Sequence, residues 1–399
     1  MKVTELLTAF SGQSAKRFEP FFGFSEQARI VGVEIHAVGV ESTTVRYSGQ
    51  ERPKKETNNI LRITTADGFE GVSGVDSFCE ERFNEEHAQD LQSVAAELIA
   101  LKTLDPVEVG AMLDREHPEL NDASRSSIDI ALWDLAARKA RCPLHKLLGS
   151  NRDSIENYAS LPFYDSLPEY TEAVNTFARH GYSAFKFHVW GSIDEDLKLV
   201  TLLQETFAGS DFRFMIDLEE KYGFKDALSL GERMDEGLFV WLEAPFSDGL
   251  LGRYAELRSK ITVQLIPDGF SFYSPEFIKR GIEAGAWDAG RFDCTAVGGI
   301  SKALELLIIA NAAGVPMEIQ SWGHSLAQAA NLHVMLANER TRYFEAPMPV
   351  EAFEFGMTSG HTNAQGRAIT TTRPGLGIEV NWEQLASADF YVRTQHGEG

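Results

Sequence analysis

The feature that most constrains the fold is a regular alternation of strand and helix patterns that begins near residue 155. Short apolar runs alternate with helical patterns of ten or more residues, at intervals of roughly 25 to 30 residues. The expected strands begin near Tyr158, Ala184, Arg213, Phe239, Val263, Ala289, Pro316 and Tyr343. Eight such units are the number that closes a (β/α)8 barrel. The sequence therefore predicts an α/β fold with a TIM-like barrel over 151–350.

The preceding part of the chain, 30–150, has a different pattern. Alternating apolar residues at 31–35 and 60–65 predict two strands, and Asp67-Gly68 after the second is a hairpin signal. Helical patterns follow at 80–101 and 124–139. We therefore expect an N-terminal α+β domain that caps the barrel. Residues 1–29 form an extension rich in Phe that we expect to dock on the protein, and 351–399 is expected to return to the cap.

Charge and cysteine content exclude several classes of function. The formal net charge is -22, which disfavours nucleic acid and anionic membranes as partners because both require a basic face. The three cysteines, Cys79, Cys142 and Cys294, are widely spaced and predict neither a disulfide framework nor a zinc site. The chain lacks a signal-peptide pattern and any apolar run near the ~20 residues that span a bilayer, so we expect a cytoplasmic location.

Three successive expected strands each end in a carboxylate, and the carboxyl ends of barrel strands are where catalytic residues gather. These residues are Asp217, Glu243 and Asp268, separated by 26 and 25 residues. Because neighbouring strands lie ~4.8 Å apart, the three side chains should converge and repel one another. A hard divalent cation relieves that repulsion, and oxygen ligands favour Mg²⁺.

Other strand ends carry ionisable residues of complementary kinds. Lys186 and His188 share one face of the second strand because they are two residues apart. Asp293, His324 and Glu345 follow the sixth, seventh and eighth strands. Each residue alone also suits a structural role, such as a helix cap, a solvated charge or a snorkelling lysine. Their coincidence at seven adjacent strand ends favours an active site.

Several motifs together resemble those of the enolase superfamily, in its mandelate racemase and muconate-lactonizing group. They are Ser126-Ser127-Ile128-Asp129-Ile130-Ala131-Leu132-Trp133-Asp134, Cys142-Pro143-Leu144, Leu147-Leu148-Gly149, Met215-Ile216-Asp217, Trp241-Leu242-Glu243-Ala244-Pro245 and Val297-Gly298-Gly299-Ile300. The resemblance covers nearly the whole chain from about residue 30. It implies an α+β capping domain, a modified (β/α)8 barrel and a C-terminal segment that returns to the cap.

The resemblance also implies roles for the strand-end residues. Asp217 and Glu243 match the first two Mg²⁺ ligands of the family, and Lys186 would neutralise the substrate carboxylate. Asp293 with His324 matches the His–Asp dyad of the mandelate racemase-like members, in which the acid orients the imidazole and raises its basicity. Glu345 matches the acid that hydrogen-bonds the substrate carboxylate.

Three departures from the family pattern concern the same site. His188 replaces the second lysine of Lys-x-Lys, so it is a base, an acid or a binding group. Asp217-Leu218-Glu219 replaces Asp-Ala-Asn. The usual Gly-Glu after the fifth strand corresponds to Gly269-Phe270, so Asp268 must supply the third metal ligand.

The resemblance implies removal of the proton next to a carboxylate, with Mg²⁺ stabilising the enediolate that forms. The His–Asp dyad with Glu345 favours dehydration of an acid sugar, with racemisation or epimerisation as the alternative. A degenerate, non-catalytic barrel and a barrel hydrolase remain further alternatives. Relatives are often dimers or octamers, so we expect a homo-oligomer. In the family the substrate is selected largely by loops of the cap, here around Tyr47 to Lys55.

Overall fold

The computed structural model describes residues 1–41, 55–76, 85–269 and 273–397. Arg46, Tyr47, Lys54, Cys79 and Phe270 lie outside these ranges, so the expected substrate loop is not part of the description below. The helices are α1 (Val3–Ser11), α2 (Glu19–Phe22), α3 (Glu85–Ala100), α4 (Pro106–Glu116), α5 (Asp122–Lys139), α6 (Leu144–Leu147), α7 (Leu167–Arg179), α8 (Ile193–Phe207), α9 (Phe224–Arg233), α10 (Leu251–Arg258), α11 (Pro275–Ala284), α12 (Ile300–Ala312), α13 (Ser325–Ala337) and α14 (Trp382–Ala386).

The strands are β1 (Ile30–Glu41), β2 (Lys55–Thr65), β3 (Glu70–Asp76), β4 (Ser154–Ser160), β5 (Ala184–His188), β6 (Arg213–Asp217), β7 (Phe239–Glu243), β8 (Gln264–Ile266), β9 (Gly290–Phe292), β10 (Met317–Ile319), β11 (Tyr343–Pro347), β12 (His361–Ala364), β13 (Arg367–Thr370) and β14 (Asp389–His396).

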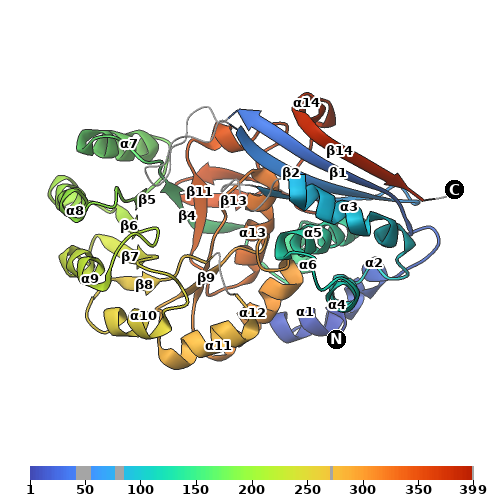
Figure 1. The fold of residues 1–399 in the computed structure, drawn as a ribbon, viewed down its shortest axis with the longest axis horizontal. Coiled ribbons are helices and arrows are strands. Elements are labelled where there is room, and N and C mark those ends of the chain that lie inside the picture. Colours follow the sequence, from blue (N-terminus) through green and yellow to red (C-terminus); the bar gives the residue numbers. More distant parts are fainter. Residues whose placement is uncertain (42–54, 77–84, 270–272, 398–399) are drawn as a thin grey trace.

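The N-terminal domain is built on a four-stranded antiparallel sheet in the order β14-β1-β2-β3. Its C-terminal strand, β14, pairs along β1 with His36 opposite Val392, so the end of the chain completes the sheet of the cap. The alternating residues of β1 and β2, among them Val33 and Ile35, pack with the apolar side of α3 in a core of their own. Figure 1 shows this sheet and α3 beside the barrel.

The second domain is a modified (β/α)8 barrel, which confirms the expected fold class. The parallel strands β11, β4, β5, β6, β7 and β8 pair in that order, and β9 pairs with β10 in a separate parallel ladder. Helices α7 to α13 each connect one strand to the next and lie outside them (Figure 1). The antiparallel hairpin β12–β13 adds to the sheet at β4.

An apolar layer fills the barrel below the strand ends. Its members come from successive strands and share one inward face: Tyr158, Ala184, Met215, Trp241, Ile266, Ala289 and Tyr343. Because side chains alternate along a strand, the residue two positions further on each strand also points inward, one layer closer to the mouth. Lys186, Asp217, Glu243 and Arg291 occupy that second layer. The barrel therefore has an apolar floor and a charged layer above it.

The cap and the N-terminal extension pack directly on the barrel. Helix α1 buries Val3, Leu6 and Leu7 in the main core and lies against α12. Strand β3 lies against α13, where Gly74 faces His324 at the N-cap of that helix. A methyl group added at Gly74 would lie 2.2 Å from Cε1 of His324, which is closer than atoms can approach. The cap therefore sets one wall around this histidine.

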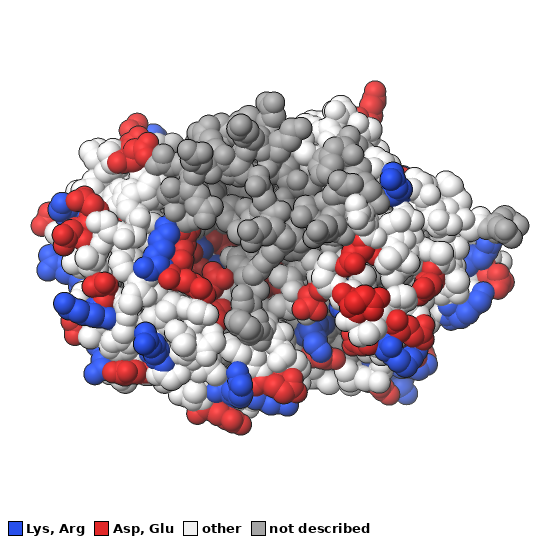
Figure 2. Space-filling model, in the orientation of Figure 1, with Lys and Arg blue, Asp and Glu red and all other residues white. Residues whose placement is uncertain are grey.

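The surface carries both signs of charge. Figure 2 shows acidic and basic side chains interspersed over one face, with acidic groups gathered left of centre. Such a mixture lacks the single-sign field that attracts polyanions. Among the described helices, none combines the length and the hydropathy that crossing a bilayer requires.

Candidate active site

Lys186 is the centre of the charged layer. Its ammonium lies 3.1 Å from Asp217 Oδ2, 3.0 Å from Glu243 Oε1 and 2.8 Å from Glu345 Oε1, and its side chain is 1% exposed. Burial alone would lower the pKa of Lys186, but Glu243 and Glu345 outweigh that cost and raise it well above the usual value. The lysine is therefore a fixed cation that joins three carboxylates from three strands.

Arg291 is a second buried cation in the same layer, and it was not among the residues expected from the sequence. Its Nη2 donates to Glu345 Oε2 at 2.9 Å and to Tyr158 Oη at 3.3 Å, and lies 3.2 Å from Glu243 Oε1. Glu243 and Glu345 thus each bridge Lys186 and Arg291. Trp241 donates its indole N–H to the other oxygen of Glu243 at 2.9 Å. The two glutamates are held by donors on several sides.

The carboxylates respond differently to this environment. Burial would raise the pKa of Asp217, but Lys186 and then His188 lower it below the usual value. Burial raises the pKa of Glu243, and the nearby Asp217 adds to that effect. Lys186 and then Arg291 outweigh burial at Glu345 and lower its pKa. Asp217 and Glu345 are therefore the carboxyls that this layer stabilises best in their ionised form.

His188 is oriented by a backbone carbonyl. Its Nδ1 lies 2.8 Å from the carbonyl oxygen of Leu161, and because a carbonyl only accepts, Nδ1 must carry the hydrogen and donate it. In the neutral ring Nε2 therefore holds the lone pair. This nitrogen lies 3.6 Å from Asp217 Oδ2 and so faces the carboxylate.

Asp268 follows β8 by two residues and has no partner for its carboxyl group among the described residues. Its backbone N–H donates to Asp248 Oδ1 at 2.9 Å, and that of Gly269 donates to Asp248 Oδ2 at 3.0 Å. Tyr273 also donates to Asp248 at 2.7 Å, so Asp248 fixes the turn that carries Asp268. Burial, then Asp248 and Asp217, raise the pKa of Asp268 to about 7. This carboxyl group needs a cation to ionise fully.

His324 and Asp293 are both buried at strand ends, but the structure does not join them as a dyad. Asp293 Oδ1 accepts from the N–H and hydroxyl of Thr295, both at 2.8 Å, and from Asn331 Nδ2 at 2.6 Å. No well-formed hydrogen bond joins either ring nitrogen of His324 to the described residues, although the backbone of Val75 lies close enough to raise its pKa slightly against burial. The three donors from Thr295 and α13 all hold Oδ1 of Asp293, and no hydrogen bond joins Asp293 to His324 among the described residues.

Burial sets the protonation state of His324. Its side chain is almost fully buried, and this lowers its pKa to about 4. The imidazole is therefore neutral at pH 7. Burial also raises the pKa of Asp293 to about 6.

The backbone beyond β6 and β7 is strained. Glu219, Glu220 and Ala244 all adopt positive φ, at 45°, 57° and 46°, which costs energy for residues that have a Cβ. The N–H of Glu219 donates to Asp217 Oδ1 at 3.0 Å, and that of Glu220 to the carbonyl of Ala244 at 2.8 Å. The two strand ends are thus tied together next to the candidate metal ligands, where strain is typical of functional sites.

The structure therefore brings together five of the eight expected residues: Lys186, His188, Asp217, Glu243 and Glu345. Asp268 lies close enough to Asp217 to raise its own pKa, whereas Asp293 and His324 are held separately. Arg291, Tyr158 and Asp248 were missed. A signal for Arg291 existed, since it lies two residues before Asp293 and so on the same face of its strand.

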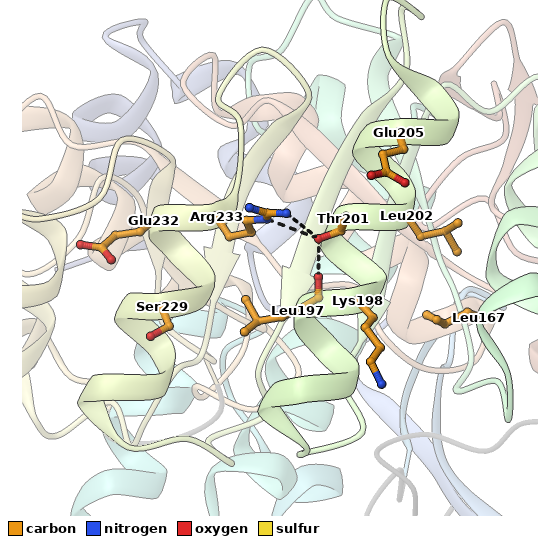
Figure 3. A pocket seen from close by; sticks show the side chains of 9 residues that line it. All are labelled: Leu167, Leu197, Lys198, Thr201, Leu202, Glu205, Ser229, Glu232 and Arg233. Carbon is orange, nitrogen blue, oxygen red and sulfur yellow. Dashed lines mark hydrogen bonds between the residues drawn. The ribbon is translucent and has the colours of Figure 1, made fainter.

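A groove on the outside of the barrel is unrelated to this site. It has a volume of about 640 Å³ and lies between α8 and α9, with Leu167 of α7 at one end (Figure 3). Arg233 crosses it and donates to Thr201 Oγ1 at 3.1 Å. None of the candidate site residues lines it.

Comparison with known proteins identifies the family. Residues 26–149 match the mandelate racemase / muconate lactonizing enzyme N-terminal domain, and 169–384 match the enolase C-terminal domain-like family. The chain belongs to the mandelate racemase and muconate-lactonizing group of the enolase superfamily. A crystal structure of a putative member from Pseudovibrio sp. is 32% identical with a TM-score of 0.88, covering 93% of this chain and 100% of that one.

Two characterised relatives are similar over much of the chain. D-galactarolactone cycloisomerase of Agrobacterium fabrum is 27% identical over 69% of this chain and 76% of its own length. L-talarate/galactarate dehydratase of Salmonella typhimurium is 26% identical over 85% of each chain. A crystal structure of the latter, liganded with Mg and L-lyxarohydroxamate, has a TM-score of 0.82 at 22% identity, covering 94% of this chain and 96% of that one.

The acidic residues of this site fit a divalent cation in chemistry and charge. Asp217, Glu243, Asp268 and Glu345 supply hard oxygen atoms, and four carboxylates against Lys186 and Arg291 leave two negative charges. The carboxyl group of Asp268 has a raised pKa, and a bound cation would favour its ionised form. Within the described residues no three His, Cys, Asp or Glu side chains already lie gathered around one point.

Proposed function

We propose that this protein removes the α-proton of a small carboxylic acid with the help of Mg²⁺, and that its substrate is an acid sugar dehydrated to a 2-keto-3-deoxy acid. The observation that carries the proposal is the combination of a buried, neutral His324 with a layer of carboxylates around Lys186 at the strand ends. The similarity to L-talarate/galactarate dehydratase supports the choice of substrate class.

In this proposal His324 is the base. An α-proton is too weakly acidic for an ordinary side chain to remove unaided, so the base must be neutral and the developing charge must be stabilised. Burial keeps the ring of His324 neutral, but a pKa of about 4 also makes it a weaker base, so the proposal requires strong stabilisation of the developing charge. Mg²⁺ bound by Asp217, Glu243 and Asp268 would supply this, by stabilising negative charge on the substrate carboxylate.

Other residues bind and protonate the substrate. Lys186 offsets the negative charge of the substrate carboxylate, and Glu345, which it contacts, accepts a hydrogen bond from a protonated or hydroxyl group of the substrate. His188 is the acid: protonated at Nε2 next to Asp217, it gives its proton to the β-hydroxyl, which leaves as water. The departing water carries the β-hydroxyl and the proton of His188, while His324 keeps the α-proton. The enol product then becomes the 2-keto acid by taking a proton at C3 and losing its O–H proton, and exchange with solvent returns both histidines to their starting states.

Racemisation or epimerisation is the second candidate, favoured by the presence of two histidines, His188 and His324, that can each hold a proton. On a substrate without a β-hydroxyl, one ring would remove the α-proton and the other would return a proton. Both reactions begin with the same step. They differ in whether a 2-keto product forms.

The test is a screen of mono- and diacid sugars with Mg²⁺ in D2O. Loss of the α-hydrogen signal by NMR reports proton removal, and a carbonyl reagent reports the 2-keto product. We expect both signals with at least one acid sugar, loss of both in His324→Asn, and retention in His361→Asn, which removes another buried histidine. Exchange without product would favour the racemase. A protein that neither exchanges hydrogen nor gains thermal stability from Mg²⁺ would be a non-catalytic barrel.

A further inference from the structure

Arg291 is a cation at a place where the fold does not require one. It lies on the inner face of β9 with 1% of its surface exposed, and it is among the largest fully buried side chains. Its Nη2 is shared by Glu243, Glu345 and Tyr158, while its Nε has no partner in the described residues. A buried guanidinium with an unused donor is costly, so the charge itself must serve the site.

Gly269 makes room for Arg291. A Cβ at position 269 would lie 2.9 Å from Cγ of Arg291, and the glycine has φ +98°, which disfavours any other residue. Asp248 holds the backbone N–H of Gly269, so this close approach is fixed. The arginine therefore fills the space that a side chain at position 269 would take.

Position 269 lies at the spacing of the barrel repeat, next to the expected third metal ligand. Asp217 and Glu243, the last residues of β6 and β7, are 26 residues apart, and a further 26 residues lead to Gly269. Gly269, directly after the third candidate ligand Asp268, thus has no side chain, and the side chain of Arg291 lies against it. Glu243, the central carboxylate of the candidate metal site, already lies 3.2 Å from that guanidinium.

We propose that Arg291 is a built-in cation of the metal site, which takes over part of the charge that a divalent ion supplies and so weakens the hold of the site on that ion. The inference rests on the proposed function, because it concerns the same carboxylates. Arg291 competes for Glu243 and repels an incoming dication at short range, where screening by water is weak. Arg291 is in this sense a positioning residue, since it acts through Glu243 and Glu345.

The test measures Mg²⁺ affinity by calorimetry, with Mn²⁺ as a second probe, and needs no substrate. Arg291→Met removes the charge and keeps an apolar side chain of similar length. We expect Mg²⁺ to bind at least tenfold more tightly than to the unaltered protein, which corresponds to about 1.4 kcal/mol. Arg291→Gln, which keeps a hydrogen-bond donor, should shift affinity in the same direction and decides the matter if the Met variant does not fold.

Arg213→Met is the matched control. It removes the same charge from the start of β6, about 13 Å from Asp217 along the strand, and should leave Mg²⁺ affinity unchanged. Unchanged or weaker Mg²⁺ binding by a folded Arg291 variant would overturn the inference. If the arginine only held the carboxylates in place, its removal would lower the affinity of the protein for Mg²⁺.

Failure of this inference and of the proposed function can be told apart. If the unaltered protein catalyses Mg²⁺-dependent α-hydrogen exchange but Arg291→Met and Arg291→Gln bind Mg²⁺ no more tightly, only the role of Arg291 is refuted. If neither the unaltered protein nor the variants bind Mg²⁺ and no acid exchanges its α-hydrogen, the proposed function itself fails.

Discussion

Substituting Gly74 by alanine tests whether the cap positions His324. The new Cβ would lie 2.2 Å from Cε1 and 2.8 Å from Nε2 of the ring, whereas ordinary contact begins at 3.4 Å. The ring must therefore move by at least 1.2 Å, because Gly74 lies in the middle of β3 and is held by its strand partners. The backbone of Gly74 is not in the left-handed region, so the cost of alanine is steric: a severe conflict with the ring of His324 and a smaller one with Cβ of Leu326 at 3.1 Å.

The displacement should affect the reaction more than the fold. Misplacing a reacting group by about 1 Å can slow a reaction on the order of 100-fold, whereas overpacking one methyl group costs roughly 1–3 kcal/mol of stability. We therefore expect Gly74→Ala to fold, to bind Mg²⁺ like the unaltered protein, and to exchange the α-hydrogen of its substrate about 100-fold more slowly. Deuterium exchange followed by NMR measures the rate, and urea unfolding measures the stability.

Gly110→Ala is the control for the glycine substitution. Gly110 lies in α4 of the same domain, and its added Cβ would meet no atom within 4 Å. It should stabilise the helix by about 1 kcal/mol and leave the exchange rate unchanged. A folded Gly74→Ala protein with an exchange rate within twofold of the unaltered one would refute the reasoning, since a base displaced by more than 1 Å cannot work equally well.

Two other predictions concern charge. Lys186→Met leaves Asp217, Glu243 and Glu345 with one buried cation fewer. The free energy of unfolding, measured in urea, should therefore fall by about 3–5 kcal/mol. A fall of less than about 1 kcal/mol would mean that the lysine is not the centre of the charged layer. Burial lowers the pKa of His324 to about 4 in the folded protein, whereas the unfolded chain has a value near 6.5. Between pH 6.5 and pH 4 the unfolded state therefore binds a proton that the folded state does not, and the free energy of unfolding decreases as the pH falls through this range. The unaltered protein should thus lose about 2 kcal/mol more than His324→Asn between pH 8 and pH 5; equal losses in the two proteins would place His324 in a more polar site.

The sequence predicted the barrel and most of its charged layer because both follow from local periodicity. Strand spacing located the ends of β6 and β7, and the two-residue alternation along β5 placed Lys186 and His188 on one face. The register of the parallel strands then places Asp217 opposite Glu243, so their carboxylates must lie together. These residues could be predicted because each contact joins elements that are adjacent in both sequence and space.

The environment of His324 and Asp293 could not be predicted in the same way. Asn331 reaches Asp293 from the second turn of α13, and Gly74 reaches His324 from the cap, across 250 residues of chain. Neither contact leaves a periodic signal in the sequence. The resemblance to the family implied the pairing of Asp293 with His324, and the described residues show no hydrogen bond between them.

Arg291 shows why a charge count and a pattern of strands must be considered together. In the sequence, an arginine in the three-residue strand β9 resembles an interruption of an apolar run. The strand pattern by itself therefore does not place Arg291 in the site. Yet four carboxylates in a buried layer cannot be offset by Lys186 alone without leaving three negative charges, more than one divalent ion neutralises. A second cation on the inner face reduces the charge left for a divalent ion from three to two. Gly269, in the turn beyond β8, has no side chain and so leaves room for the side chain of Arg291.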